Sequence, residues 1–282
     1  MINTVRTIRR LVTGSAQVDG AGVRLVRVIG RADTQEFDPF LMLDAFDSRN
    51  PDDYTRGFPW HPHRGIETVT YLIQGDIEHS DSLGNKGSIL DGCCQWMTAG
   101  SGILHQEMPQ ASERMLGVQL WLNLPRRDKM TRPQYRDLTA AMIPRIQEPG
   151  ASVGVIAGQY NQTTGATQGD YVKALFLDIE LEPGREWQLP TDREDTLFIY
   201  IVAGAGYFAG DRKQLTGSHQ AVLFGQGDRF IARAGDQGLR FLLFAAPPLR
   251  EPVAWGGPIV MNTREELQQA FQEIEDGTFI RK

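Results

Sequence analysis

Short runs of β-branched and aromatic residues, each ended by glycine or proline, constrain the fold of this chain more than any other feature. Examples are "TVTYLI" at 68–73, "GVQLWLNLP" at 117–125 and "TLFIYIVAG" at 196–204. The chain's 30 glycines and 15 prolines punctuate these runs, which recur at 152–158, 171–181, 220–225 and 238–247. Runs of this length and spacing are typical of antiparallel sandwiches and barrels. The predicted fold class is therefore all-β.

The two halves of the chain repeat one pattern. When Gly75 is aligned with Gly204, the stretch "ETVTYLIQG" lies on "TLFIYIVAG" and Tyr71 lies on Tyr200. Each half later reaches an apolar run that ends in proline, "GVQLWLNLP" in the first and "GLRFLLFAAPP" in the second. Self-similarity of this kind indicates a duplicated structural unit. We expect two antiparallel β-barrel or jelly-roll domains, at 1–135 and 136–282, with the boundary in the polar, proline-containing stretch near 133–150.

Only the C-terminus has the pattern of a helix. In "NTREELQQAFQEIEDG" (262–277), Thr263 and Glu266 form a capping box, and Gly277 is a natural stop. The apolar residues of this stretch fall on one helical face, namely Leu267, Ala270, Phe271 and Ile274. We expect this helix to pack on the outside of a barrel and to carry no chemistry.

Charge and apolar content exclude several classes of protein. The formal net charge is −6, with 23% charged and 41% hydrophobic residues, so nothing favours nucleic acid as a direct ligand. No run approaches the length of a membrane span, and "MINTVRTIRRLVTGS" lacks the apolar centre of a secretory signal. Cys93 and Cys94 are adjacent, and neighbours in a strand point to opposite faces, so no disulfide is expected between them. The expected location is the cytoplasm.

Four side chains in two short motifs are the candidate metal ligands: His61 and His63 in "PWHPHRG", and His105 and Glu107 in "LHQEMP". Residues i and i+2 of a strand point the same way, so each pair can face one interior and facing strands would bring the pairs together. Three imidazoles and a carboxylate suit iron, manganese or a similar ion and leave positions open for water, dioxygen or substrate. A lone pair of histidines is often only exposed to solvent on the surface. Two motifs in one half of the chain, each flanked by glycines and strand-like runs, favour a metal site.

The identity of the carboxylate ligand stays open at this point. Glu67 lies four residues after His63, so a straight strand would put it on the same face, and it is an alternative to Glu107. Gly65 lies between them and can break the strand. Glu67 would then orient an imidazole by a hydrogen bond instead of binding the metal.

The second half lacks the ligand set. Under the same alignment, His61, His63 and Glu67 fall on positions occupied by proline, aspartate and threonine. His79 and His219 stand apart from both motifs, and we expect ordinary surface or satisfied histidines there. Four aromatic residues lie near the motifs; we expect at least two in the core, and the others can wall a pocket suited to an aromatic substrate: Phe58, Trp60, Trp96 and Trp121.

Two long stretches, "FPWHPHRGIETVTYLIQG" and "QWMTAGSGILHQEMP", resemble the pirin family of the cupin superfamily. The upstream "RVIGRADTQEFDPFLMLDAF" (27–46) resembles that family's N-terminal segment, and the resemblance covers most of the chain, more weakly after about residue 130. The general cupin motif has a proline where Thr98 stands here, and an asparagine after the last histidine where Glu107 appears. Pirins take their ligands from H-x-H and H-x-E. The matching positions are His61, His63, His105 and Glu107.

The resemblance implies a bicupin with a metal in its N-terminal domain and none in its C-terminal domain. The implied cofactor is one divalent ion per chain, Fe(II) first, with zinc, manganese, nickel, cobalt or copper as alternatives. The implied activity is that of a quercetin 2,3-dioxygenase, which opens a flavonol with O2, with Glu107 as the base that takes the 3-hydroxyl proton.

Two non-enzymatic functions stand beside this one. Some pirins act as regulators through protein partners, such as transcription factors or a pyruvate dehydrogenase subunit. A third possibility is a metal-stabilised binding domain for a small acid or sugar.

Overall fold

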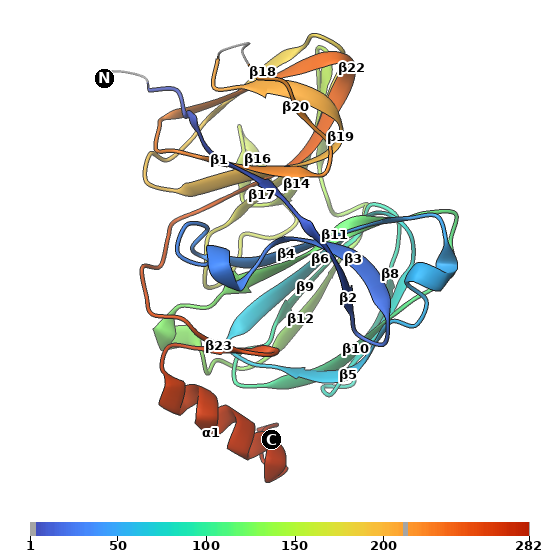
Figure 1. Cartoon of the computed structure of the whole chain (residues 1–282), viewed down its shortest axis with the longest axis vertical. Coiled ribbons are helices and arrows are strands. Elements are labelled where there is room, and N and C mark those ends of the chain that lie inside the picture. Colours follow the sequence, from blue (N-terminus) through green and yellow to red (C-terminus); the bar gives the residue numbers. More distant parts are fainter. Residues whose placement is uncertain (1–3, 211–213, 282) are drawn as a thin grey trace. The chain divides into compact units, whose positions relative to one another are not determined.

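The computed structural model describes residues 4–210 and 214–281, and the chain divides into two compact units (Figure 1). The first unit consists of Ser15–Ala140 with Leu249–Lys282, and the second consists of Ala141–Pro248 with Met1–Gly14. Apart from one C-terminal helix and three short 3-10 turns (Arg31–Asp33, Pro51–Asp53 and Arg126–Asp128), the regular elements of the described residues are strands. The all-β prediction is confirmed.

The first unit is built on two antiparallel sheets. The larger has the order β12-β9-β6-β11-β4-β3-β2, and the smaller has the order β5-β10-β7-β8. A short hairpin, β23-β24, and the helix α1 complete the unit. The bounds of its elements are β2 Ser15–Asp19, β3 Val23–Ile29, β4 Phe40–Ser48, β5 Phe58–His63, β6 Ile66–Gln74, β7 Ile77–Asp81, β8 Lys86–Ile89, β9 Cys94–Thr98, β10 Ile103–Pro109, β11 Met115–Asn123, β12 Gln134–Leu138, β23 Ala254–Gly256, β24 Ile259–Met261 and α1 Arg264–Glu275.

The second unit is built on one nine-stranded antiparallel sheet. Its main path is β1-β21-β19-β22-β17-β14-β13, with β18 pairing β22 and β20 pairing β19, and β15-β16 forms a separate hairpin. The bounds are β1 Ile8–Thr13, β13 Arg145–Glu148, β14 Ala151–Ala157, β15 Gln159–Tyr160, β16 Thr163–Thr164, β17 Leu175–Leu181, β18 Glu186–Pro190, β19 Thr196–Phe208, β20 Thr216–Gly217, β21 Gln220–Phe224 and β22 Arg229–Ala246.

The strand orders of the two units match position by position. In the first unit β6 lies between β9 and β11, and in the second β19 lies between β21 and β22. The aligned tyrosines of the sequence repeat, Tyr71 and Tyr200, lie on these two central strands. The repeat in the sequence is therefore a repeat of topology.

The compact units divide the chain differently from the predicted boundary at 135/136. The sheet position that β12 holds in the first unit is filled in the second by β1, which comes from the N-terminus and pairs with β21. Residues 249–282 in turn belong to the first unit. Both terminal segments are thus exchanged relative to a simple division of the chain into two halves.

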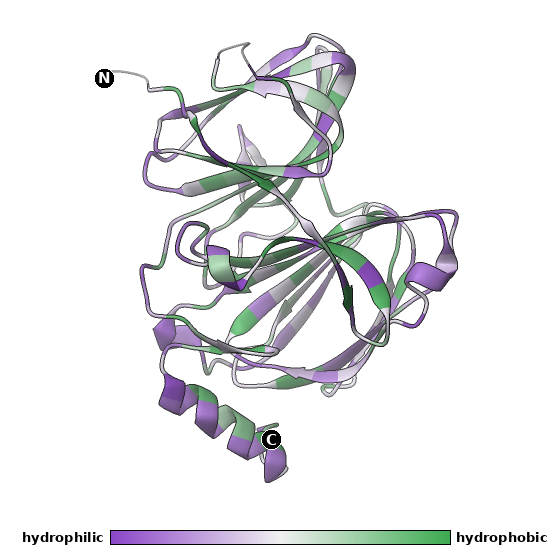
Figure 2. Ribbon diagram, in the orientation of Figure 1, coloured by the Kyte–Doolittle hydropathy of each residue, from purple (hydrophilic) through white to green (hydrophobic). Residues whose placement is uncertain are grey.

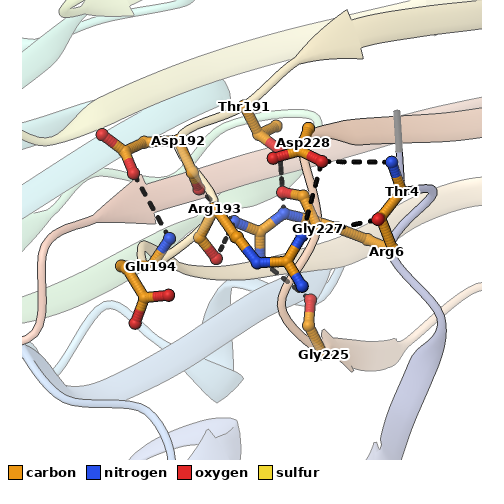
Figure 3. Close-up of polar contacts among 9 residues, drawn as sticks. All are labelled: Thr4, Arg6, Thr191, Asp192, Arg193, Glu194, Gly225, Gly227 and Asp228. Carbon is orange, nitrogen blue, oxygen red and sulfur yellow. Dashed lines mark hydrogen bonds and ion pairs between the residues drawn. The ribbon is translucent and has the colours of Figure 1, made fainter. Parts of the chain in front are cut away.

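A buried arginine fixes the N-terminal segment of the second unit (Figure 3). The Arg6 side chain is 1% exposed; its guanidinium donates to the carbonyl oxygen of Gly225 at 3.0 Å and to Thr191 Oγ1 at 2.9 Å, as well as to the carbonyl of Asp192. Close by, the backbone N–H of Thr4 donates to Asp228 at 3.1 Å. These partners explain why the segment that leads into β1 joins this unit.

Two buried cations fix the C-terminal segment of the first unit. Lys129 Nζ donates to the carbonyl oxygens of Gly65 at 2.7 Å and Val260 at 3.0 Å. Arg64 donates to the carbonyl oxygen of Phe279 at 3.0 Å and pairs with Glu273 on α1 at 2.7 Å. Because both cations lie close to β5 and β6, they tie residues 249–282 to the strands that follow the H-x-H motif.

The predicted helix is present as α1. The Thr263 hydroxyl accepts from the Glu266 N–H at 3.1 Å, and the Glu266 carboxylate accepts from the Thr263 N–H at 3.0 Å, so the capping box is formed. Figure 2 shows the helix as largely hydrophilic with a narrower hydrophobic strip. Ala270 is buried, but Phe271 stays 38% exposed, so the strip is only partly covered in the first unit.

The interiors of the two units differ in chemistry. The second is filled with aliphatic and aromatic side chains, among them Trp187, Phe208, Phe230 and Phe241. The first buries polar side chains, including His63, His79, His105 and Glu107. Cys93 and Cys94 carry free thiols, as predicted. Within the described part of the chain, no helix has the length and apolar character needed to cross a membrane.

Candidate metal centre

Two neighbouring strands carry the H-x-H and H-x-E motifs. β5 and β10 pair antiparallel, with His105 directly opposite His61 and Ile103 opposite His63 (Figure 1). β5 is the edge strand of its sheet. An edge strand tolerates proline, which explains how "FPWHPH" forms a strand at all. The i, i+2 spacing then directs both members of each pair to the same side.

The three imidazoles converge on one point. Their ring centroids are 4.8 Å (His61–His63), 4.3 Å (His61–His105) and 5.0 Å (His63–His105) apart. One ring nitrogen of each lies within 4.8 Å of one from each of the others, and no carboxylate oxygen of the described residues joins this group. The structure therefore brings together three of the four predicted ligands in a triad that could hold a metal ion.

The tautomers of two of these rings are fixed by backbone carbonyls. The Nδ1 atoms of His61 and His63 lie 2.8 Å from the Pro59 oxygen and 3.0 Å from the Pro258 oxygen. A carbonyl can only accept, so both Nδ1 atoms carry the proton and both Nε2 atoms carry a lone pair. These Nε2 atoms are 3.0 Å apart. Two lone pairs facing each other repel unless a cation lies between them, and the side chains therefore fit a bound metal ion.

Burial keeps these imidazoles neutral. Desolvation is the largest cause that lowers the pKa of His63 to about 3, and the proximity of His61 adds to it. Burial also lowers the pKa of His61, and that of His105 falls well below its ordinary value for the same reason. Neutral imidazole is the form that binds a metal, so the ligands need not lose a proton at pH 7.

Glu107 lies on the same face of β10 as His105 and lines the cavity beside the triad. Its carboxylate accepts a hydrogen bond from Thr70 Oγ1 at 3.0 Å, and the same hydroxyl contacts the side-chain oxygen of Gln119. Burial raises the pKa of Glu107 to about 7. A carboxyl group whose pKa is raised toward neutral pH suits the exchange of a proton.

Glu67 does not face the triad. It lies on β6, which belongs to the other sheet of the first unit, and accepts a hydrogen bond from Thr98 Oγ1 at 2.7 Å. It is an odd number of residues from Thr70, whose side chain points to Glu107, so Glu67 points to the opposite face. Gly65, at φ 77°, ends the strand between His63 and Glu67. The even spacing from His63, which made Glu67 an alternative ligand, therefore no longer puts the two side chains on one face.

A cavity of about 750 Å³ lies against the triad in the first unit. Its walls combine aromatic side chains with charged ones: Phe58, Trp60, Trp121 and Trp255, and Asp19, Arg27, Arg31 and Asp44. Trp121 meets the His63 ring edge-on at 5.0 Å. Of the aromatic residues near the motifs, Trp96 is buried in the core. The other three form part of the cavity wall.

Three charged residues on one wall of the cavity, Asp19, Arg27 and Asp44, are paired with one another. The Arg27 guanidinium donates to both carboxylate oxygens of buried Asp44, at 2.9 and 2.8 Å, and to Asp19 at 2.9 Å. Burial raises the pKa of Asp44 in spite of this pairing, while the bond to Asp44 is the main cause that raises the pKa of Arg27. The network gives the cavity a polar wall of paired side chains in addition to its aromatic lining.

Several residues of the site were not predicted from the sequence. His79 was expected at the surface or in a satisfied position. It is buried beside His105, and its ring nitrogens form no hydrogen bond among the described residues, although Nε2 lies 3.7 Å from the Asp81 carboxylate. Thr70 and Gln119 contact Glu107 or each other, and Trp255 and Pro258 come from the C-terminal segment. The alternation in "IEHSD" is the one signal that pointed to an inward-facing His79. Nothing in the sequence linked residues 255–258 to the motifs.

Comparisons with known proteins agree with this architecture. Residues 22–122 match the Pirin family model, and residues 176–280 match the Pirin C-terminal cupin domain. A pirin-like protein of Caulobacter vibrioides is 42% identical over 278 residues, which cover 98% of this chain and 99% of the relative. Human pirin is 41% identical over 265 residues, covering 92% and 89% of the two chains.

A solved structure extends the comparison to the fold. The crystal structure of a quercetin 2,3-dioxygenase from Acinetobacter baumannii superimposes with a TM-score of 0.88 at 31% identity, covering 98% of this chain and 99% of that one. Similarity over nearly the full length, two matching family models and a duplicated β topology all lead to one assignment. This chain belongs to the pirin family of two-domain cupin proteins.

Proposed function

We propose that the protein is a metal-dependent dioxygenase that opens a flavonol-like aromatic substrate with O2. The single observation that carries the proposal is the composition of the cavity. Aromatic side chains, two imidazoles of the triad and the Glu107 carboxyl group all line it. The resemblance in sequence and fold to a quercetin 2,3-dioxygenase supports the same reaction class.

The histidines of the triad and the tryptophans of the cavity have different proposed roles. His61, His63 and His105 would hold one divalent ion, proposed to be Fe(II), which suits imidazole combined with carboxylate. When bound, such an ion acidifies a coordinated hydroxyl group and holds both reactants together. The indole rings of Trp60, Trp121 and Trp255 can stack on or wall a planar polycyclic substrate.

Glu107 is the proposed general base. Its carboxyl group borders the same cavity as the histidines, and its pKa near 7 lets it accept the proton of a flavonol 3-hydroxyl without remaining permanently protonated. Thr70 holds the accepting carboxylate in place by its hydrogen bond. We also propose that the Glu107 carboxylate, which borders the same cavity, serves as the fourth ligand of the ion.

Two observations test the proposal together. Iron-loaded protein mixed with quercetin in the absence of O2 is expected to shift the long-wavelength absorption band of the flavonol, since the bound enolate differs from the free phenol. Admission of air is then expected to consume O2 and release carbon monoxide. An unshifted band together with no carbon monoxide would contradict the proposal. The alternative of a regulator that acts through a protein partner stays a prediction beside it.

A further inference from the structure

A fourth histidine lies behind the triad, inside the first unit. His79 is on β7, where Ile77, His79 and Asp81 are the buried residues of an alternating pattern. Its ring centroid is 5.6 Å from that of His105, with 55° between the ring planes. In the register of β7 with β10, His79 is opposite Glu107 and Asp81 is opposite His105. His79 is thus the next ring beyond His105, away from the cavity lining.

The nitrogens of these two rings lack hydrogen-bond partners within the described residues. All four ring nitrogens of His79 and His105 are buried without a hydrogen bond to any described residue. A buried polar atom left in this state is destabilising. A metal ion on one nitrogen of His105 would satisfy that nitrogen alone. The other stays protonated in a neutral ligand and still needs an acceptor, which ligating histidines regularly find in a neighbouring group.

The spacing allows His79 to be that acceptor. An imidazole nitrogen lies about 1.2 Å from its ring centre, so a centroid separation of 5.6 Å leaves about 3.2 Å between nitrogens that point at each other. For comparison, the His61 and His63 centroids are 4.8 Å apart, and their Nε2 atoms are 3.0 Å apart. Rings turned so that two nitrogens face each other would therefore be within hydrogen-bond distance.

The surroundings hold the His79 ring in one orientation. Tyr135 stacks on it, with centroids 4.6 Å apart and 12° between planes. His79 Nε2 lies 3.7 Å from Asp81 Oδ2. That carboxylate is itself fixed, because it accepts from the backbone N–H groups of Leu83 at 2.9 Å and Asn85 at 3.0 Å. The Nε2 side of the ring thus faces an acceptor, and the lone pair belongs on Nδ1.

We propose that His79 is a positioning residue for His105. Its Nε2–H points toward Asp81, and its Nδ1 accepts a hydrogen bond from the ring N–H of His105. His79 thereby does for the third ligand what the carbonyl oxygens of Pro59 and Pro258 do for the other two. The inference rests on the proposed metal site and adds to it a chain of carboxylate, imidazole and ligand that sets the direction of the His105 lone pair.

The test measures metal affinity in metal-free protein, with Co(II) as the probe and a competing chelator. His79→Phe keeps a flat ring against Tyr135 and removes both nitrogens, so we expect Co(II) to bind about 10- to 100-fold more weakly. We also expect a changed visible Co(II) spectrum, because the His105 ring is free to turn. The matched control is His219→Phe, at an exposed histidine of the second unit, which should bind as the unaltered protein does.

Two amide variants separate positioning from simple packing. His79→Asn places an amide oxygen where Nδ1 lies, so affinity and spectrum should recover to within a few-fold of the unaltered protein. His79→Gln places its amide where Nε2 lies and should remain weak. If the phenylalanine variant fails to fold, the difference in Co(II) affinity between the asparagine and glutamine variants tests the role of His79.

The outcomes keep the two proposals apart. Equal Co(II) affinities and spectra for the asparagine and glutamine variants, or unaltered binding in the phenylalanine variant, would overturn the role of His79. Failure of the unaltered protein to bind Co(II) would instead contradict the metal site on which the proposed function depends.

Discussion

The distances between single atoms explain why the triad fits an ion. A metal–nitrogen bond of about 2.1 Å places two ligands at right angles about 3 Å apart, and the Nε2 atoms of His61 and His63 are 3.0 Å apart. Because their Nδ1 protons are committed to carbonyls, this separation has no explanation as an ordinary hydrogen bond. The rings are spaced for a cation between them.

Loss of one imidazole from the triad should empty the site. His105→Ala removes the ligand whose two ring nitrogens are both buried and unpartnered in the described structure. We expect Co(II) affinity to fall by more than about 100-fold, which exceeds the usual effect of removing a group behind a ligand. Metal analysis by mass spectrometry after dialysis measures this. His219→Ala is the control, and retention of metal by His105→Ala would rule out its role as a ligand.

Loss of the Glu107 charge should affect turnover more than metal content. Glu107→Gln keeps the size of the side chain and a hydrogen-bonding oxygen for Thr70, but it cannot take a proton. If Glu107 is the base, kcat on quercetin falls by about 100- to 10,000-fold, while the three histidines still retain metal. Steady-state O2 uptake and metal analysis of the same preparation measure both. Unchanged kcat would exclude Glu107 as the base.

The alternation of side chains along a strand was enough to predict that the three histidines lie together. It was not enough to predict where the residues around them lie. His61, His63 and His105 follow from the i, i+2 rule together with the choice of which strands face inward. By its spacing from His63, Glu67 would share the same face, but the chain turns at Gly65 and Glu67 lies in the other sheet. His79 reaches His105 only through the pairing of β7 with β10, and pairing between strands is not visible in a single sequence.

At the scale of elements, the strongly apolar strands were predictable and the irregular ones were not. The run at 68–73 lies within β6, and the run at 196–204 lies within β19. The helix predicted within 262–277 spans Arg264–Glu275. By contrast, β1 reads "IRRLVT" and β5 contains two prolines, so neither has the pattern of a strand. Both form because a neighbouring strand offers unpaired backbone groups.

One loop of the second unit makes its stability depend on pH. Burial, and the proximity of Asp192, raise the pKa of half-buried Asp195 to about 6, above the unfolded value of about 3.9. Between these values the folded chain holds a proton that the unfolded chain has lost. The contribution of Asp195 to stability is therefore full below about pH 4 and is lost as pH rises through 6.

Asp195→Asn should remove this dependence. The variant is expected to melt up to about 2 °C higher than the unaltered protein at pH 7.5, a small shift because solvent screens a half-exposed charge. The difference should shrink at pH 4.5, where the folded aspartate is already neutral. Calorimetry at both pH values measures it. A difference that grows toward low pH would contradict the assignment.

At the scale of the whole molecule, the duplicated strand order was predictable and the exchange of terminal segments was not. Aligned glycines and tyrosines showed that one unit repeats the other. They did not show that β1 would fill in the second unit the place that β12 has in the first. Such an exchange depends on long-range partners, such as Arg6 with Gly225 and Lys129 with Val260.

The terminal segment should therefore be needed by the metal site. A chain that ends at Pro248 loses the carbonyl of Pro258, which orients His63, and the acceptor of Lys129 at Val260. We expect at least a 10-fold loss of Co(II) affinity and a lower melting temperature for the first unit. Titration and calorimetry against the full chain measure both. Undiminished affinity would show that residues 249–282 do not support the site.

The location of the bound ion is the decisive test of the proposed metal site. Crystals of metal-loaded protein, examined by anomalous X-ray scattering at the absorption edge of the metal, should show one ion per chain in contact with Nε2 of His61, Nε2 of His63 and one ring nitrogen of His105. An ion bound at other residues, with none in contact with these three histidines, would contradict the proposed site.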